Sequence, residues 1–297
     1  MGKSRAMDIK AILMGLAFAA MWSSAFTSAR IIVEFAPPLT ALACRFLVSG
    51  VIGVMIAKAL GQTMQLSRRQ WIGVLVFGVC QNALYLGLNF VAMQTVEASL
   101  AAIIASTMPL LVGLAGWLFM GQRMRPLGTA GLVAGIIGVT LIMGARLDGG
   151  VDVYGLTLLV IGVVSLTIAT LAVLGASSGG NVLMIVGLQM LVGSALLWGP
   201  ALAFETFDVT WNWQLIVAFI YTTLVPGLLA TWVWFLLVGR IGAVKASTFH
   251  FLNPFLGVAI AAVLLGEKLG AMDLIGVVII AGGILAVQLS KQPVTNH

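Results

Sequence analysis

The chain has 297 residues, of which 61% are hydrophobic and only 8% are charged, and its formal net charge is +6. Soluble globular proteins carry about 25% charged residues, so a water-facing surface of the usual kind is excluded, and no polar stretch is long enough for a separate soluble domain. The basic residues do not gather into a stripe, so we expect no nucleic acid as a partner. The apolar stretches are continuous rather than alternating, which argues against a β-barrel.

Charged residues, Gly and Pro divide the chain into ten apolar segments, each long enough to cross a hydrocarbon core of ~30 Å as a helix. The predicted spans are 10–30, 38–59, 70–92, 97–120, 126–145, 153–175, 181–202, 213–238, 243–265 and 271–290. We therefore predict an all-α membrane protein with about ten transmembrane helices and short linkers. The basic start followed by segment 10–30 has the outline of a signal peptide. We interpret it as an uncleaved span, because the repeat described below needs it.

The distribution of basic residues predicts the orientation of these spans, because Lys and Arg are enriched in cytoplasmic loops. With the N-terminus in the cytoplasm, the cytoplasmic segments collect eleven of the 15 basic residues and the opposite side collects three. The acidic residues divide the other way. We therefore expect a multi-pass protein of the bacterial inner membrane with both termini cytoplasmic.

The chain also repeats itself at an offset of 145 positions. Residues 96–140 align with 241–285, which places Pro109 on Pro254, Gly121 on Gly266, Arg123 on Lys268, Gly131 on Gly276 and Gly138 on Gly283. The offset predicts two five-helix halves, 1–148 and 149–297. Since five is odd, the second half enters the membrane inverted, and transporters built in this way bind substrate near the midplane between their repeats.

Several segments resemble the EamA-type exporters of the drug/metabolite transporter superfamily. They are FAAMWSSAFTSAR in the first span, PPLTALACRFLVSG with Arg45 in the second, and the paired segments from Pro109 to Arg123 and from Pro254 to Lys268. Gln122 stands where the family often has Glu, and Trp22-Ser23-Ser24 replaces a more usual Trp-Gly-Ser. The resemblance covers essentially the whole chain. It implies a ten-helix bacterial exporter of small metabolites, similar to aromatic amino acid exporters, which does not itself hydrolyse ATP.

Polar side chains inside spans are costly and tend to face a cavity or another helix. On a regular helix Asn82, Tyr85 and Asn89 share one face, with Gln81 at its edge, and His250 lies one turn before Asn253. The predicted substrate-binding residues are Trp22, Ser23, Gln81, Asn82, Tyr85, Asn89, Trp232, His250 and Asn253. Hydrogen bonding between helices is the alternative for the polar ones, and a proton-carrying role is a further hypothesis for His250.

Three more residues are predicted to act in helix breaks or gating. Pro109 and Pro254 interrupt matched spans, and such interruptions are typical of transporter binding sites. Simple kinks that help packing are the alternative. Arg45 is a charge inside a span and needs a partner or a cavity. We favour a structural or gating contact for it over contact with a substrate carboxylate.

These observations predict a transporter that exports small metabolites, most of all amino acids, by alternating access around a central cavity. We expect a monomer surrounded by lipid, with no cofactor and no metal, since Cys44 and Cys80 lack ligand spacing. No Walker-type loop or nucleophile–base pattern suggests an enzyme. The alternatives are a nucleotide-sugar or phosphate-ester exchanger, for which Arg45 and Lys245 are the candidate cavity cations, and a solute channel. The solute and any proton coupling stay open.

Overall fold

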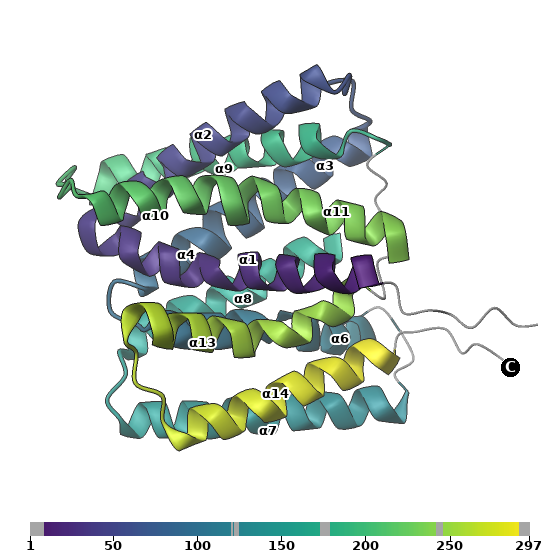
Figure 1. The fold of residues 1–297 in the computed structure, drawn as a ribbon, viewed down its shortest axis with the longest axis vertical. Helices are drawn as coiled ribbons and strands as arrows, with labels where there is room; N and C mark the ends of the chain where they lie inside the picture. Colours follow the sequence, from purple (N-terminus) through teal and green to yellow (C-terminus); the bar gives the residue numbers. More distant parts are fainter. Residues whose placement is uncertain (1–8, 120, 122–124, 173–178, 242–245, 291–297) are drawn as a thin grey trace, which may run out of the picture.

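The computed structural model describes residues 9–119, 121, 125–172, 179–241 and 246–290, and every regular element in these ranges is a helix (Figure 1). Ten helical stretches in this part of the chain are long and apolar enough to cross a membrane, which confirms the predicted ten-span, all-α architecture. Both termini lie outside the described residues, as do some residues used in the sequence arguments. These are Lys3, Arg5, Gln122, Arg123, Lys245 and Lys291.

Each half consists of five spans, some of them interrupted. The first half contains α1 (Ile9–Phe35), α2 (Pro38–Ala59), a third span of α3 (Arg68–Phe77), η1 (Gly78–Leu86) and α4 (Gly87–Ala92), a fourth of α5 (Ala98–Ser106) and α6 (Met108–Phe119), and α7 (Pro126–Asp148). The second contains α8 (Val153–Ala172), α9 (Val182–Phe204), an eighth span of α10 (Trp213–Leu224), η2 (Val225–Leu229) and α11 (Ala230–Ile241), a ninth of η3 (Thr248–Leu252) and α13 (Asn253–Leu265), and α14 (Ala271–Ser290).

The interruptions have recognisable physical causes. Pro109 and Pro254 are the second residues of α6 and α13, where the missing proline N–H has no helical partner to lose. Each of these spans is therefore divided near its proline. The segments η1 and η2 are π-helical, and η3 is a 3₁₀ turn.

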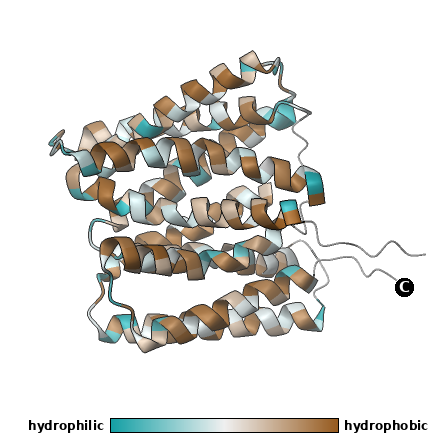
Figure 2. Cartoon of the chain, viewed as in Figure 1, coloured by the Kyte–Doolittle hydropathy of each residue, from teal (hydrophilic) through white to brown (hydrophobic). Residues whose placement is uncertain are grey.

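The outer surface of the bundle is apolar along the length of the helices, and hydrophilic residues lie mostly near helix ends (Figure 2). Large side chains such as Phe119 and Val263 are more than four-fifths exposed, at 83% and 82%. Water would make such exposure unfavourable, whereas lipid does not. The chain is thus a multi-pass membrane protein.

Two pairs of equivalent helices flank the bundle, α2 with α9 and α7 with α14 (Figure 1). A Cβ atom added to Gly131 would lie 2.7 Å from the carbonyl oxygen of Gly283, and one added to Gly138 would lie 2.9 Å from that of Gly276. Under the sequence offset Gly131 corresponds to Gly276, and Gly138 to Gly283. The contacts therefore exchange equivalent residues, as expected when two inverted repeats pack about an approximate two-fold axis.

The α2–α9 pair shows the same exchange at its two ends. The carboxylate of Glu205, which follows α9, accepts hydrogen bonds from the backbone N–H groups of Leu39 and Thr40 at the start of α2, at 2.7 and 2.8 Å. The amide oxygen of Gln62, which follows α2, accepts one from the N–H of Met184 near the start of α9, at 3.0 Å. These groups have no partner inside their own helices, so each capping residue ties the two repeats together.

Candidate functional site

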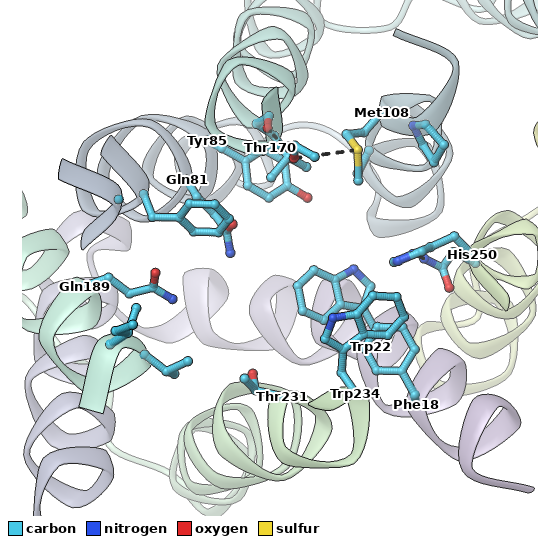
Figure 3. A pocket seen from close by; sticks show the side chains of 18 of the residues that line it. Phe18, Trp22, Gln81, Tyr85, Met108, Thr170, Gln189, Thr231, Trp234 and His250 are labelled. Atoms are coloured by element: carbon cyan, nitrogen blue, oxygen red, sulfur yellow. Dashed lines mark hydrogen bonds between the residues drawn. The ribbon is translucent and has the colours of Figure 1, made fainter. Parts of the chain in front are cut away.

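A cavity of about 380 Å³ lies between the two halves, lined by α1, α3, η1, α5 and α6 from the first and α8, α9, α11, η3 and α13 from the second (Figure 3). This volume falls within the range of about 300–1,000 Å³ that is usual for small-molecule sites. The position agrees with the expectation for inverted repeats, whose shared site lies where the repeats meet.

The cavity reaches the surface at one end of the bundle and stops inside the protein at the other. Arg69, at the start of α3, is exposed and lines the cavity. At the opposite end the lining residues are Phe26, Tyr85 and Ala102, which are all buried. We refer to the end beside Arg69 as the open end and to the other as the closed end.

One wall of the cavity is aromatic (Figure 3). The ring of Phe18 lies 5.7 Å from Trp22 and 4.7 Å from Trp234 between centroids. The imidazole of His250 packs edge-on against Phe18 at 5.4 Å and lies 5.2 Å from Trp234. Rings held at these separations support one another and offer π faces to a planar group or to a cation.

The facing wall carries neutral polar groups. The side-chain amides of Gln81 and Gln189 point into the cavity, and the side chains of Tyr85 and Thr170 lie beside Met108 (Figure 3). Within the described part of the chain neither glutamine amide has a hydrogen-bond partner, so both are available to a ligand. Arg69 is the only Lys, Arg, Asp or Glu among the described lining residues, and it lies at the mouth.

The structure brings some of the predicted site residues to this cavity and places others elsewhere. Those that line it are Trp22, Gln81, Tyr85, Pro109, His250 and Asn253. The others pack between helices or face outward, and they are Ser23, Arg45, Asn82, Asn89, Trp232 and Pro254.

Some polar residues of the third span face the cavity and others face neighbouring parts of the protein, because the geometry of this span departs from a regular helix. Its cavity-facing residues include Gly73, Phe77, Gln81 and Tyr85, a strict spacing of four. The π-helical turns of η1 hold more than 3.6 residues each, so positions four apart stay on one face. A period of 3.6 residues instead predicts a shared face for Asn82, Tyr85 and Asn89. The four-residue spacing of Gln81 and Tyr85 was the signal for the face that the cavity uses.

The two asparagines of this span make contacts within the protein. The amide of Asn82 donates to the backbone carbonyl of Gln189 in α9 at 2.8 Å. The amide of Asn89 donates to the carbonyl of Tyr85, one turn earlier in its own span, also at 2.8 Å. Both side chains are buried. In this conformation Asn82 joins the third span to α9, and Asn89 bonds within its own span.

Ser23 and Trp232 likewise lie away from the cavity. The hydroxyl of Ser23 donates to the carbonyl of Asn253 at 3.3 Å, which joins α1 to α13. Trp232 is 50% exposed on the outside of α11, whereas Trp234 lines the cavity. Which of the two tryptophans faces inward depends on the rotation that η2 imposes on α11, and a π-helical turn has no clear sequence signal.

Arg45 makes a contact between helices. Its side chain is 6% exposed, its Nε donates to the backbone carbonyl of Thr222 in α10 at 3.3 Å, and its guanidinium lies 5.2 Å from the centroid of the Phe46 ring. Pro254 is buried in α13 and does not line the cavity. Among the described residues no group of three or more His, Cys, Asp or Glu side chains could hold a metal ion.

Comparison with known proteins agrees with this architecture. The sequence pattern of the EamA-like transporter family matches residues 9–144 and again residues 153–289, one match for each half. A crystal structure superposes with a TM-score of 0.69 at 20% identity, covering 95% of this chain and 97% of the other. This likeness supports the fold.

Several of the similar sequences are named as transporters. YvbV of Bacillus subtilis, an uncharacterized transporter, is 27% identical over 92% of this chain and 89% of its own. YedA of Escherichia coli K12, an uncharacterized inner membrane transporter, is 25% identical over 94% and 91%. The aromatic amino acid exporter YddG of Ancylobacter novellus is 29% identical over 47% of this chain and 48% of its own.

Proposed function

Because the chain belongs to the EamA-like transporter family, we propose that it exports amino acids, aromatic ones among them, by alternating access around the cavity. The observation that carries this proposal is the pairing of an aromatic wall, Phe18, Trp22 and Trp234, with the free amides of Gln81 and Gln189 across the cavity. A planar side chain would stack on the first wall, and the second would bind the polar ends of the molecule.

The chemistry of the cavity suits a molecule with no net charge. The ammonium group of an amino acid would lie against the tryptophan faces or donate hydrogen bonds to the amide oxygens. Its carboxylate would take hydrogen bonds from the amide N–H groups and from the hydroxyl of Tyr85. The name of one relative, which is similar over about half of this chain, supports the same substrate class.

The alternatives receive less support from the cavity. A nucleotide sugar or phosphate ester asks for several cations, and Arg69 is the lone charged group among the described lining residues. Arg45 does not line the cavity, and Lys245 lies outside the described residues. A channel requires a continuous path, whereas this cavity stops at buried residues. A carrier with one end open at a time fits better.

We also propose that the protein works as a monomer in the bacterial inner membrane, with lipid around its apolar surface and both termini in the cytoplasm. The excess of basic residues in alternate loops supports this orientation, and one similar protein is named an inner membrane transporter. In that orientation the open end of the cavity faces the cytoplasm.

Counterflow in liposomes tests the function. Purified protein is reconstituted, the liposomes are loaded with one unlabelled amino acid, and uptake of the same radiolabelled amino acid is followed. We expect a transient, saturable overshoot for tryptophan, phenylalanine and tyrosine. Flux without an overshoot would indicate a channel, and the absence of counterflow for every amino acid in the panel would overturn the proposed substrate class.

A further inference from the structure

Three buried oxygen atoms, in the cavity wall or between the cavity and the surface beyond its closed end, have no hydrogen-bond partner within the described residues. They are Thr27 Oγ1 in α1, Ser99 Oγ in α5 and Asn253 Oδ1 in α13. These three helices pack on one another. A buried polar atom without a partner is unfavourable, and its presence asks for an explanation. A second conformation in which water or a ligand reaches these atoms provides one.

The three atoms follow one another from the cavity toward the closed end. Asn253 lines the cavity and contacts Ser23 of α1, and Thr27 lies one helical turn further along α1. Ala102 lines the cavity where it stops, and Ser99 lies one turn closer to the start of α5. The unpartnered oxygens therefore mark a line that continues the cavity toward the surface.

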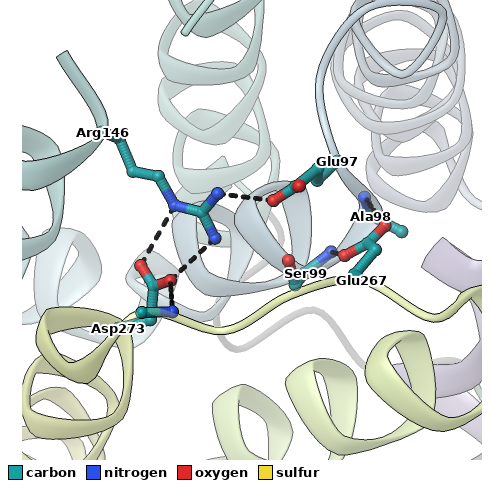
Figure 4. Close-up of polar contacts among 7 residues, drawn as sticks. Glu97, Ala98, Ser99, Arg146, Glu267 and Asp273 are labelled. Atoms are coloured by element: carbon teal, nitrogen blue, oxygen red, sulfur yellow. Dashed lines mark hydrogen bonds and ion pairs between the residues drawn. The ribbon is translucent and has the colours of Figure 1, made fainter. Parts of the chain in front are cut away.

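A carboxylate from the second half lies against the start of α5, beside Ser99 (Figure 4). The two oxygens of Glu267, in the loop between α13 and α14, accept hydrogen bonds from the backbone N–H groups of Ala98 and Ser99 at 2.8 and 2.9 Å. The first N–H groups of a helix have no partner inside it, and the helix dipole favours a negative charge there. Glu267 thus holds the second half against the start of α5.

An arginine adds a second connection between the halves at this end (Figure 4). Arg146, at the end of α7, donates to both oxygens of Asp273 in α14 at 3.0 and 2.9 Å and to Glu97 at 2.5 Å. The guanidinium is partly shielded from solvent, with 18% of its side chain exposed. A two-pronged contact of this kind fixes direction as well as distance. We call Glu97, Arg146, Glu267 and Asp273 the latch.

We propose that the substrate leaves the cavity at the closed end, between α1, α5 and α13, and that the latch holds this exit shut. This inference rests on the proposed transport function. Opening withdraws Glu267 from α5 and lets water reach Thr27 and Ser99. The α2–α9 pair, which is tied at both of its ends, serves as scaffold.

Thiol labelling tests the exit without any substrate. In a background with Cys44→Ser and Cys80→Ser, one reporter cysteine is placed at the exit, Ser99→Cys, or in the open cavity, Ser106→Cys. Each protein is reconstituted in lipid nanodiscs and treated with a charged, membrane-impermeant maleimide. Glu267→Ala is expected to raise the labelling rate at Ser99→Cys by about tenfold and to lower that at Ser106→Cys, because opening one end closes the other. Glu267→Gln, which keeps an acceptor oxygen, should give a smaller change.

Glu205→Ala is the matched control, since Glu205 also caps a helix of the other repeat but belongs to the scaffold pair. It should leave both labelling rates unchanged. An unchanged rate at Ser99→Cys in the Glu267→Ala protein would overturn the proposal. So would rates that rise together at both reporters, or equal effects of Glu267→Ala and Glu205→Ala, because each indicates general loosening.

The labelling experiment tests the exit and the counterflow experiment tests the transport function, so each proposal can be rejected without the other. If labelling changes as expected while no amino acid shows counterflow, the exit stands and the proposed substrate class is rejected. If counterflow succeeds while labelling at Ser99→Cys does not respond to Glu267→Ala, the transport function stands and the exit is rejected.

Discussion

The guanidinium of Arg45 donates to the backbone carbonyl of Thr222, the carbonyl that Pro226 cannot serve because proline has no N–H. In a regular helix the N–H four residues later would bond to this oxygen. A charged side chain from the first half thus supports the eighth span of the second half where that span changes from α10 to η2. The contact explains how an arginine is accommodated inside a span.

A double-mutant cycle tests this interpretation. Arg45→Leu is expected to lower the thermal unfolding temperature of the purified protein, because a buried carbonyl without its donor costs about 1–3 kcal/mol. The same change should cost less in a Pro226→Ala background, where the new N–H is available to Thr222. The temperatures are measured by fluorescence-detected size-exclusion chromatography after heating. Equal losses in the two backgrounds would show that Arg45 and Pro226 are independent.

Two tryptophans of α11, two residues apart, face different surroundings. Trp234 lines the cavity, and Trp232 lies on the outer surface. Trp234→Ala should raise the half-saturation concentration for aromatic amino acids about two- to twelvefold, since an aromatic pair is worth ~0.5–1.5 kcal/mol. Trp232→Ala removes an equally large side chain from the outside of the same helix and should leave transport unchanged. Counterflow at a series of concentrations gives both values. A larger effect of Trp232→Ala would contradict the cavity as the substrate site.

Substitution of two adjacent amide residues in the third span should affect different properties, substrate binding for Gln81 and stability for Asn82. Gln81→Ala is expected to weaken substrate binding with little change in stability, because its amide faces the cavity. Asn82→Ala removes the donor to Gln189 and should lower stability by roughly 0.6 kcal/mol, the average for such bonds in membranes. Counterflow and thermal unfolding are measured on both proteins. If Asn82→Ala weakened binding more than Gln81→Ala, the regular helical face 82–85–89 would be the functional one.

Two adjacent glycines in α14 provide a test of the repeat interface. Gly283→Ala should destabilise the protein by about 1–3 kcal/mol, because the new methyl group would meet the carbonyl of Gly131 in α7. At Gly282 an added Cβ meets nothing within 4 Å, so Gly282→Ala should be neutral or slightly stabilising. The unfolding temperatures of the two variants are measured and compared with that of the unchanged protein. Similar losses would mean that helix conformation, rather than close packing with α7, explains the effect.

The fold could be predicted from sequence to a large extent because lipid imposes a simple requirement. A segment must be long, apolar and helical to cross the membrane, and the predicted span 38–59 coincides with Pro38–Ala59. The glycine pattern at offset 145 likewise pointed to the repeat, since close packing of α7 on α14 tolerates no side chain at Gly131 or Gly283.

The candidate site could be predicted only in part, because the direction of a side chain depends on local helix geometry. Trp22, Gln81 and His250 lie in the cavity as their polarity or size suggested. Asn82 turns to α9 because η1 is π-helical, and Trp234 rather than Trp232 faces inward because α11 follows η2. A period of 3.6 residues cannot locate either face.

Composition, hydropathy and spacing were therefore enough to predict that lipid surrounds this protein, how many spans it has and that it consists of two related halves. Each of these properties follows from the transfer of whole segments into lipid. The open and closed ends of the cavity and the latch could be identified only from the tertiary structure. The latch joins the two halves through contacts between residues more than a hundred positions apart, such as Glu267 with Ser99 and Arg146 with Asp273. Such contacts exist only once two inverted halves have packed together.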